Sequence, residues 1–351
     1  CGADSWRDIT DFAHEREEFL LSSLKLAHGI PSPDTFRRVF AALDVEAFGA
    51  AFVTWTRSLC ETTQGKLIAL DGKSLRGSFT APTKQDARHI VSAWVGENRV
   101  VLGQVSTDAK SNEITAIPKL LDMLDINGAT ITIDAMGCQK KIVRKILDKN
   151  GEYVIAVKDN QPTLNGEVES AFATMEITED QLPVGCLHES TNRGHGRTEA
   201  RRVTAVEAEG WLSEDLIESW PGLRSIIRVQ ATRTVSGKTS EESRYYISSR
   251  TPDAEALGRA IREHWGIENT QHWTLDMAFD EDRSRTRRKN APDNLALLRR
   301  IALNILKQAS NKSRGKHLSV RGKRLKAGWS DRYLGELLKM VGGYQDGAEV
   351  G

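Results

Sequence analysis

The chain has 351 residues, and its 49 Lys and Arg residues nearly balance its 48 Asp and Glu residues, so a formal net charge of +1 identifies no class of partner. Hydrophobic residues at 39% and charged residues at 28% exclude a largely disordered chain. No apolar run approaches the roughly 18 residues of a membrane helix, and the N-terminus lacks the layout of a secretory signal. We therefore expect a soluble globular protein of the cytoplasm.

The four cysteines lie far apart in the sequence, at Cys1, Cys60, Cys138 and Cys186. They form no Cys-x-x-Cys pair, which argues against a zinc site or a disulfide framework, so we expect reduced, structural thiols. The chain begins at Cys1 instead of Met, and its first residues resemble the middle of a domain. We expect N-terminal sequence to be missing.

Residues 1–62 carry a helical pattern. Apolar side chains recur at near-helical spacing on both sides of Pro31 and Pro33, at Ile9, Phe12, Phe19, Leu20, Phe36, Val39, Phe40 and Leu43. This pattern predicts a small helical N-terminal module that occupies residues 1–62.

Residues 63–310 alternate between strand and helix patterns. Short apolar runs predict strands at 66–70, 90–95, 100–105, 130–133 and 153–157, and helical spacing predicts helices around 114–124 and 142–147. The order β-β-β-α-β-α-β is typical of a ribonuclease H-like core, so we expect an α/β fold with a mixed sheet and flanking helices. A β-rich insertion is expected at about 187–250, and further helices at roughly 253–275 and 294–308.

Positive charge is concentrated near the C-terminus. Fifteen Lys or Arg residues and one acid, Asp293, lie between Arg283 and Lys326. Charge runs are more often solvated helix faces, but such faces usually mix both signs. The single sign predicts a polyanion partner, with 311–351 as a basic C-terminal tail.

Asp71 and Asp134 each follow an apolar strand, and sites in α/β sheets form at the carboxyl ends of strands. If the two strands are neighbours, the carboxylates lie close together, a repulsion that a divalent cation relieves. For either Asp alone, an ordinary strand-end or capping role is the commoner case.

Glu268 is the third acid. Helical spacing from Leu257 and Ile261 places Glu268 on the face that the apolar residues bury, where a carboxylate needs a metal or a cationic partner. A salt bridge to Arg262 or Arg283 explains Glu268 equally well. Glu199 is the reserve candidate for the third acid.

Three carboxylates suit Mg²⁺, because this ion prefers oxygen ligands, and His and Cys at zinc spacing are absent from the sequence. Two such ions can activate an attacking hydroxyl and stabilise the leaving oxygen of a phosphodiester. The three acids and the basic segment together predict phosphoryl transfer on nucleic acid.

Five motifs in one order resemble bacterial insertion-sequence transposases of the H-repeat-associated type, a branch of the DDE superfamily. They lie at Ile68–Gly77, Lys110–Pro118, Thr132–Gln139, Ala156–Gln161 and His264–Trp273. The resemblance implies a ribonuclease H-like fold and a metal-binding catalytic triad of Asp71, Asp134 and Glu268. It also implies Mg²⁺, replaceable by Mn²⁺, with cleavage at element ends and strand transfer.

The partners implied by this resemblance are double-stranded DNA, as terminal inverted repeats and target DNA, and further copies of the chain in a dimer or higher multimer. No membrane partner is expected, and the protein would work at the bacterial nucleoid. Related transposases have Tyr, Arg and Lys around the catalytic Glu, where this chain has Ile261, His264 and Leu275. We read these differences as variation within the branch, with His264 as a DNA contact.

Other polar residues are candidates for binding DNA phosphates. They are Lys73, Arg76, Lys110, Lys158, Asn160, Gln161, Arg283, Arg285, Arg287, Arg288 and Lys289. The alternatives are surface charge for Lys73 and Arg76, and a plain helix-start turn for Asn160 and Gln161. Trp265 and Trp273 either stack on an extruded base or belong to the core.

Two rival functions remain open from the sequence. The first is a ribonuclease H-like nuclease that hydrolyses DNA without strand transfer. The second is a non-catalytic DNA-binding remnant of a truncated transposase.

Overall fold

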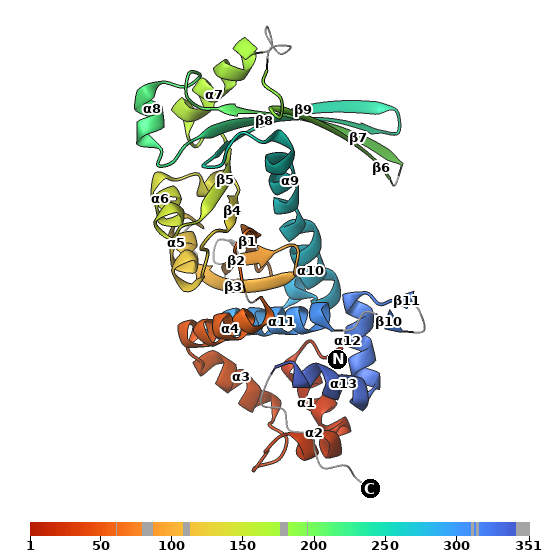
Figure 1. Cartoon of the computed structure of the whole chain (residues 1–351). Helices are drawn as coiled ribbons and strands as arrows, with labels where there is room; N and C mark the ends of the chain where they lie inside the picture. Colours follow the sequence, from red (N-terminus) through yellow and green to blue (C-terminus); the bar gives the residue numbers. More distant parts are fainter. Residues whose placement is uncertain are drawn as a thin grey trace.

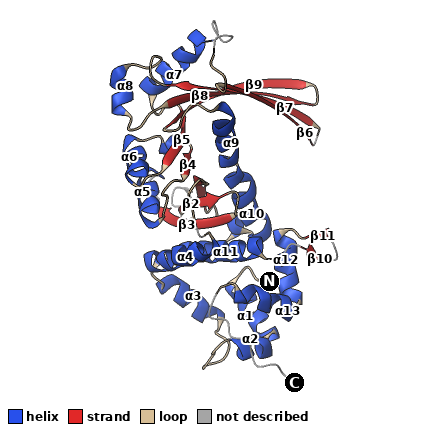
Figure 2. Ribbon diagram, in the orientation of Figure 1, coloured by secondary structure: helices blue, strands red, loops and turns tan. Residues whose placement is uncertain are grey.

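The computed structural model describes residues 1–60, 62–78, 87–107, 113–175, 182–194, 196–309, 312–313 and 316–341. Its largest feature is a nine-stranded sheet with helices packed on its faces, and a separate group of helices lies below it (Figures 1 and 2). The expected α/β fold with a mixed sheet and flanking helices is confirmed.

The first five strands form the ribonuclease H-like part of the sheet. They are β1 (Leu67–Ser74), β2 (His89–Val95), β3 (Val100–Thr107), β4 (Thr130–Ile133) and β5 (Glu152–Val157). They lie in the order β3-β2-β1-β4-β5, with β2 antiparallel to both neighbours and β1, β4 and β5 parallel. Two crossover helices, α5 (Glu113–Met123) and α6 (Lys140–Asp148), join β3 to β4 and β4 to β5.

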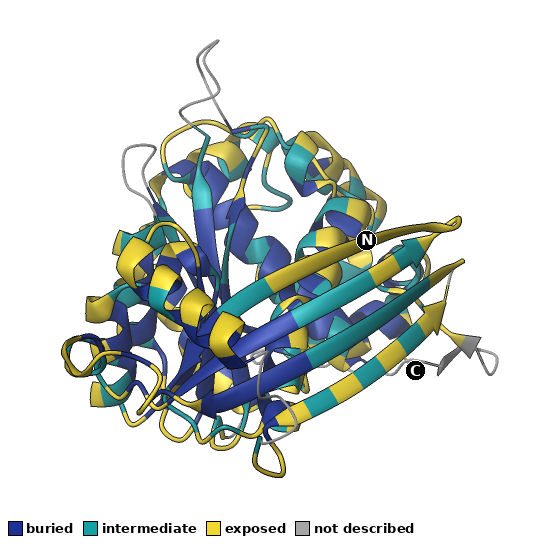
Figure 3. Ribbon diagram, turned by 90° about the horizontal axis from the view of Figure 1, so that it is seen from above, coloured by how far each residue is buried: buried dark blue, intermediate teal, exposed yellow. Residues whose placement is uncertain are grey.

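Four more strands extend the same sheet beyond β5. They are β6 (Leu187–Gly194), β7 (Arg197–Glu207), β8 (Ser225–Val235) and β9 (Lys238–Ser248). β9 pairs antiparallel with β5, so the β-rich segment continues the central sheet. In β8 and β9 the residues near β5 are buried and the far ends are exposed, so the hairpin tips project from the body (Figure 3).

Alternating side chains bury both faces of the central strands. On β1, Ile68 and Leu70 join a large apolar cluster, whereas Leu67 and Ala69 belong to clusters on the other face. The helices on the Ile68 side contribute Val53, Ile117 and Ile142, among others, to the large cluster. Those helices include α4 (Val45–Leu59), α5, α6, α7 (Pro162–Met175) and α8 (Glu214–Ser219).

The opposite face is covered by the helices that follow β9. They are α9 (Ala254–His264), the π-helical turn η3 (Ile267–His272), α10 (Trp273–Phe279), the short turn η4 (Glu281–Arg283) and α11 (Ala291–Gln308). Leu257 and Ile261 of α9 pack against β7, β8 and β9, while Leu297 of α11 packs with Trp94 of β2. The chain from 254 to 308 therefore buries one face of the sheet along nearly its whole width (Figure 1).

The N-terminal helices pack with the C-terminal helices. The former include α1 (Trp6–Glu15), α2 (Glu17–Ser23) and α3 (Pro33–Ala42), and the latter are α12 (Val320–Trp329) and α13 (Asp331–Lys339). Arg16 Nη1 lies 2.9 Å from Asp331 Oδ1, and Trp55 Nε1 donates to the carbonyl of Met340 over 3.3 Å. Residues 320–339, expected to belong to a basic tail, are thus folded helices. The small hairpin of β10 (Lys312–Ser313) and β11 (Lys316–His317) precedes them.

Part of the C-terminal positive charge is internal. Arg299, Arg300, Lys323 and Arg324 are all buried. Lys323 Nζ donates to the carbonyls of Leu306 and Ala309 over 2.7 and 2.8 Å, so it caps the end of α11. The cations between Arg283 and Lys326 therefore do not all face a polyanion partner, because several of them are buried and stabilise the fold.

Among the described residues, all four cysteines are free thiols, and Cys60, Cys138 and Cys186 are buried. No single described helix is long and apolar enough to span a membrane, and only the pair α3 and α4, bent by 91° between them, passes that test together.

Candidate active site

Asp71 and Asp134 lie on neighbouring parallel strands. Leu70 of β1 is paired with Ile133 of β4, so the next residue along each strand is an aspartate. The expectation that the two strands are neighbours is confirmed. The pairing brings both carboxylates to the same edge of the sheet, because parallel strands end together.

The Asp134 carboxylate also caps the short turn η1 (Ala135–Gly137). Its Oδ1 accepts hydrogen bonds from the backbone N–H groups of Met136 and Gly137 over 3.0 and 3.3 Å. A Cβ at Gly137 would lie 2.2 Å from Cγ2 of Ile133, so only glycine fits this close approach. Asp134 therefore does cap this turn, as the alternative interpretation of its position predicted. Only Oδ1 makes these hydrogen bonds, so Oδ2 can bind another group.

Glu268 lies in the π-helical turn η3 and is exposed, while its neighbour Ile267 is buried. The expectation that Glu268 sits on the buried face is wrong. The helix expected over 253–275 ends at His264, and the π turn after Gly266 shifts the angular position of every later residue. Arg262 and Arg283, the alternative salt-bridge partners, contact Asn192 and Asp280 instead.

The carboxylates influence one another electrostatically. Burial, together with the negative charges of Glu268, Asp134 and Glu113, raises the pKa of Asp71 to about 8, against a hydrogen bond from the Gly72 N–H that lowers it. Burial, followed by the charge of Glu113, also raises the pKa of Asp134. In both aspartates, burial and neighbouring negative charge outweigh the interactions that favour the charged form.

This donor set fits a divalent cation in its chemistry. The ligands are hard carboxylate oxygens, and a cation would relieve the mutual repulsion at Asp71. Within the described ranges, no three His, Cys, Asp or Glu side chains are already grouped at metal-binding distance.

Two histidines from the helices after β9 lie beside the aspartate strands. His272 Nδ1 lies 3.6 Å from Asp71 Oδ2, and His264 Nδ1 lies 3.0 Å from the Thr132 hydroxyl. Burial lowers the pKa of His272 to about 3 and that of His264 to about 4. Both rings are neutral at pH 7, so His264 can offer DNA a hydrogen bond but no positive charge.

Lys73 and Arg76 follow Asp71 but differ in exposure. The Lys73 side chain is only 8% exposed, and its Nζ lies 2.9 Å from carboxylate oxygens of both Asp276 and Asp282. Lys73 therefore links β1 to α10 and η4 through ion pairs. Its predicted role as a phosphate contact is corrected, because its side chain is buried and already paired with carboxylates. Arg76 is 82% exposed and lies 3.4 Å from Asp282, so it can reach a phosphate.

The segment after β5 borders Asp134 from the other side. Lys158 is exposed, and its charge partly offsets the raised pKa of Asp134. The side-chain amides of Asn160 and Gln161 instead donate to the carbonyls of Ala135 and Cys138 over 2.7 and 2.8 Å. These two hydrogen bonds hold the loop that carries Asp134. Neither the predicted phosphate contact nor the alternative helix-start turn for Asn160 and Gln161 included this role.

The cationic segment before α11 is on the surface. Arg283, Arg285, Arg287, Arg288 and Lys289 are all exposed. With Arg37 and Arg299 and the polar start of α1, most of them line an open groove between the N-terminal helices and the end of η4. Lys110 lies outside the described residues.

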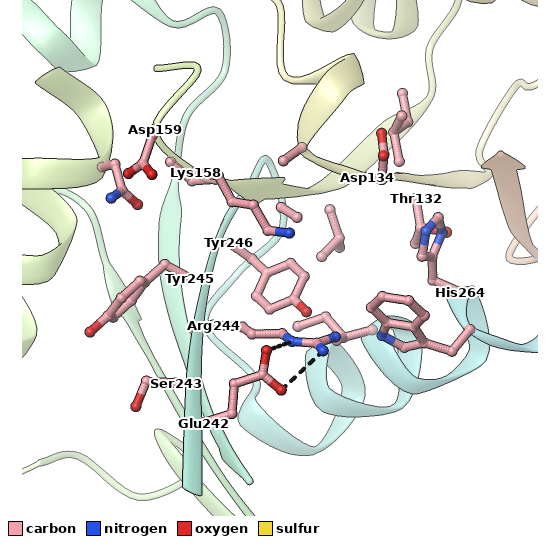
Figure 4. A pocket seen from close by; sticks show the side chains of 18 of the residues that line it. Thr132, Asp134, Lys158, Asp159, Glu242, Ser243, Arg244, Tyr245, Tyr246 and His264 are labelled. Carbon is pink, nitrogen blue, oxygen red and sulfur yellow. Dashed lines mark hydrogen bonds and ion pairs between the residues drawn. The ribbon is translucent and has the colours of Figure 1, made fainter. Parts of the chain in front are cut away.

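A pocket opens beside Asp134 and is lined by residues of β4, β5, β9 and α9 (Figure 4). On its floor, Arg244 donates to both oxygens of Glu242 over 2.7 and 3.0 Å and stacks 4.7 Å from the Trp265 ring centre. Trp265 is 36% exposed and Trp273 61% exposed, so these rings are not core residues. Glu199, the reserve acid, lies on β7, four strands from β4, and pairs with Arg201.

The sequence interpretation gave no role to three side chains near the acids. They are His89, Glu113 and His272. Glu113 lies within the Lys110–Pro118 motif and begins the helix that follows β3. Its place inside one of the five motifs was the signal that could have drawn attention to Glu113.

Comparisons with known proteins give two matching family models and several similar proteins. A family model described as "Transposase DDE domain" matches residues 62–305, and one described as "DDE_Tnp_1-associated" matches residues 1–56. The chain is 42% identical over 343 residues to "Putative transposase YncI" of Escherichia coli O157:H7, with 96% of this chain and 85% of the relative covered. It is 38% identical over 341 residues to "H repeat-associated putative transposase YhhI" of Escherichia coli K12, with 96% and 88% covered.

Proposed function

Because this chain belongs to the DDE transposase family, we propose that it cuts DNA at the ends of an insertion sequence and transfers the freed 3′ ends to target DNA. The observation that supports this proposal most is the pairing of Leu70 with Ile133, after which Asp71 and Asp134 follow side by side. Glu268 is the third member of the set, and its charge acts on Asp71.

Asp71, Asp134 and Glu268 would hold two Mg²⁺ ions, for which Mn²⁺ can substitute. When bound, these ions supply the positive charge that stabilises the attacking and leaving oxygens of a phosphodiester. The remaining side chains position this centre. Asn160 and Gln161 fix the loop after Asp134, and neutral His272 packs against Asp71 without competing as a cation.

Double-stranded DNA is the proposed substrate, first as terminal inverted repeats and then as target DNA. Exposed cations on two sides of the acids are available to its phosphates. They are Arg76, Lys158, Arg283, Arg285, Arg287, Arg288 and Lys289. A dimer or higher multimer on paired ends is part of the proposal, because strand transfer joins two element ends to one target.

The experiment is strand cleavage and joining on a labelled duplex that carries the element's own terminal repeat, with Mg²⁺. The chain is compared with its Asp134→Asn variant, which keeps the size of the side chain and the capping oxygen. Metal-dependent nicks and joined products should appear with the chain and vanish with the variant.

The products also separate the rival functions. Nicks without joined molecules would favour a nuclease that lacks strand transfer. Binding of the duplex without cutting, equal for both proteins, would contradict the catalytic proposal and favour a DNA-binding remnant.

A further inference from the structure

The strands β6, β7, β8 and β9 form a four-stranded ribbon whose outer half projects beyond the body of the protein (Figure 3). The pairing of these strands keeps one register from the hairpin tips toward the body. Residues directly opposite each other on antiparallel strands point to the same side of a sheet. The register therefore assigns each side chain of the ribbon to one of two faces.

One of these faces, here called the α9 face, is continuous with the candidate active site. Val203 of β7 packs with residues of α9 on this face, and Asn192 of β6 accepts a hydrogen bond from Arg262 of α9 over 3.4 Å. Arg244 of β9 lies in the same row as Val203. It also lines the pocket that opens beside Asp134 (Figure 4). The α9 face thus runs from that pocket out to the tips of the ribbon.

The two faces of the ribbon differ in charge. In the rows from Arg197 to Val203, the α9 face has five cations and two acids, a net charge of +3. These residues are Arg197, Arg201, Arg233, Lys238, Arg244, Glu199 and Glu242. The opposite face is neutral over the same rows, with two cations and two acids, which are Arg193, Arg202, Glu189 and Glu241. Positive charge is therefore in excess only on the α9 face, which adjoins the candidate active site.

Both acids of the α9 face are paired with neighbouring arginines. Glu199 lies 2.5 Å from Arg201, and Glu242 accepts two hydrogen bonds from Arg244. The other three cations are exposed and form no ion pair among the described residues; they are Arg197, Arg233 and Lys238. A projecting face with uncompensated charge of one sign suits a polyanion such as DNA.

The length of the ribbon fits a short stretch of duplex. Lys238 at the tip of β9 is six residues from Arg244 at the pocket. A strand rises about 3.4 Å per residue, so the α9 face reaches about 20 Å beyond the pocket. This is the length of about six base pairs. A duplex whose reacting phosphate lies beside Asp134 can therefore follow this face for about half a helical turn.

We propose that the α9 face of the ribbon binds the backbone of double-stranded DNA next to the reacting phosphate. The inference rests on the proposed function, and it gives DNA a second surface besides the cationic segment before α11. Contacts between cations and phosphates add affinity and fix position without reading the base sequence. Docking of a second copy of the chain on this face is the alternative. It predicts altered assembly and unaltered affinity for DNA.

The test compares two exposed arginines of one hairpin that point to opposite faces. Arg197→Ser changes the α9 face, and the matched control Arg193→Ser changes the other face. Fluorescence anisotropy measures binding of the full chain to a labelled duplex with the terminal repeat, at several salt concentrations and without metal. Arg197→Ser should reduce the slope of log affinity against log salt concentration by about 0.9, and Arg193→Ser should leave the slope unchanged.

A triple variant measures the whole surface and its place on the DNA. Arg197→Ser, Arg233→Ser and Lys238→Ser together should reduce the slope by about 2–3. Shortening the duplex by about six base pairs on one side of the reacting phosphate should abolish this difference, and the same shortening on the other side should preserve it. Thermal unfolding should not change, because the three side chains are exposed. If the triple variant does not fold, the single variants provide the same test.

The outcomes distinguish this inference from the proposed function. Equal slopes for Arg197→Ser and Arg193→Ser, in a chain that cuts and joins DNA, would refute the ribbon contact and leave the proposed function standing. The expected slopes in a chain that never cuts DNA would support the ribbon contact and contradict the catalytic proposal. An altered sedimentation coefficient of the triple variant with an unchanged slope would overturn the inference in favour of contact between copies.

Discussion

Arg300 and Glu281 form a buried ion pair outside the group of candidate catalytic acids. Both side chains are 0% exposed, and Arg300 Nη1 lies 2.8 Å from Glu281 Oε1. Arg300 Nε also donates to the Ser92 hydroxyl over 3.3 Å, on the residue paired with Asp71. This buried pair thus links α11 and η4 to the strand beside the candidate site.

We expect Arg300→Met to lower the free energy of unfolding by about 3–5 kcal/mol, because it leaves the Glu281 charge buried without a partner. The control is Arg332→Met, whose partner Glu336 lies 3.8 Å away and whose side chain is 90% exposed. It should change the free energy by no more than about 0.5 kcal/mol. Urea unfolding monitored by tryptophan fluorescence measures both, and equal values would contradict the assignment.

Asn160 tests whether the loop after Asp134 depends on its side-chain support. Asn160→Ala removes the 2.7 Å hydrogen bond to the carbonyl of Ala135. The cleavage rate should fall roughly 10- to 100-fold, because a small displacement of a reacting group is costly. Affinity for the duplex should stay unchanged in a mobility-shift assay. Lys158→Ala should instead weaken binding, and a loss of affinity in Asn160→Ala would restore the phosphate-contact interpretation.

At the scale of elements, the turn between α9 and α10 determines where Glu268 lies. Apolar spacing predicted a continuous helix over 253–275, and the buried residues Leu257 and Ile261 do follow it. Glu268 does not, because it lies in the six-residue π turn η3. The spacing of apolar residues along the sequence does not reveal a π turn. Such a turn contains one residue more than an α-helical turn, and this residue is accommodated only by packing against Trp94 and the sheet.

Gly266 is the position at which this turn meets the sheet. A Cβ there would lie 2.8 and 2.9 Å from two ring carbons of Trp94, which is buried. Gly266→Ala should therefore destabilise the protein by about 1–3 kcal/mol and reduce cleavage by displacing Glu268. Gly166→Ala on α7, with no atom within 4 Å of the new Cβ, should stabilise it by about 0.5–1 kcal/mol. Chemical unfolding and the cleavage assay test both, and a neutral Gly266→Ala would count against the close contact.

At the scale of the whole molecule, helices from both ends of the chain lie beside the exposed cationic segment that precedes α11. Arg283, Arg285 and Arg288 line a groove whose other wall comes from α1 and α3. Arg324 of α12 contacts Asp4, and Arg16 contacts Asp331, so contacts between the N- and C-terminal helices hold this wall. The groove exists only because segments far apart in sequence pack together.

We expect the double variant Arg285→Ser and Arg288→Ser to bind duplex DNA more weakly and with less dependence on salt. For each arginine that neutralises a phosphate, its replacement by serine should reduce the slope of log affinity against log salt concentration by about 0.9. Arg332→Ser, an equally exposed site on α13, should leave the slope unchanged. Fluorescence anisotropy at several salt concentrations measures the slope, and an unchanged slope in the double variant would exclude this groove as a DNA-binding surface.

The sequence by itself determined the order of strands and helices, the mixed sheet and the adjacency of Asp71 and Asp134. It could do so because apolar periodicity is local and because parallel strands joined by a helix have few arrangements. Its motifs also determined the family. The tertiary structure alone decided which charges face solvent. Lys73, Arg300 and Lys323 read as surface cations but are buried with partners, and Glu268 reads as buried but is exposed. Exposure depends on contacts between distant segments, so no local pattern of residues could have determined it.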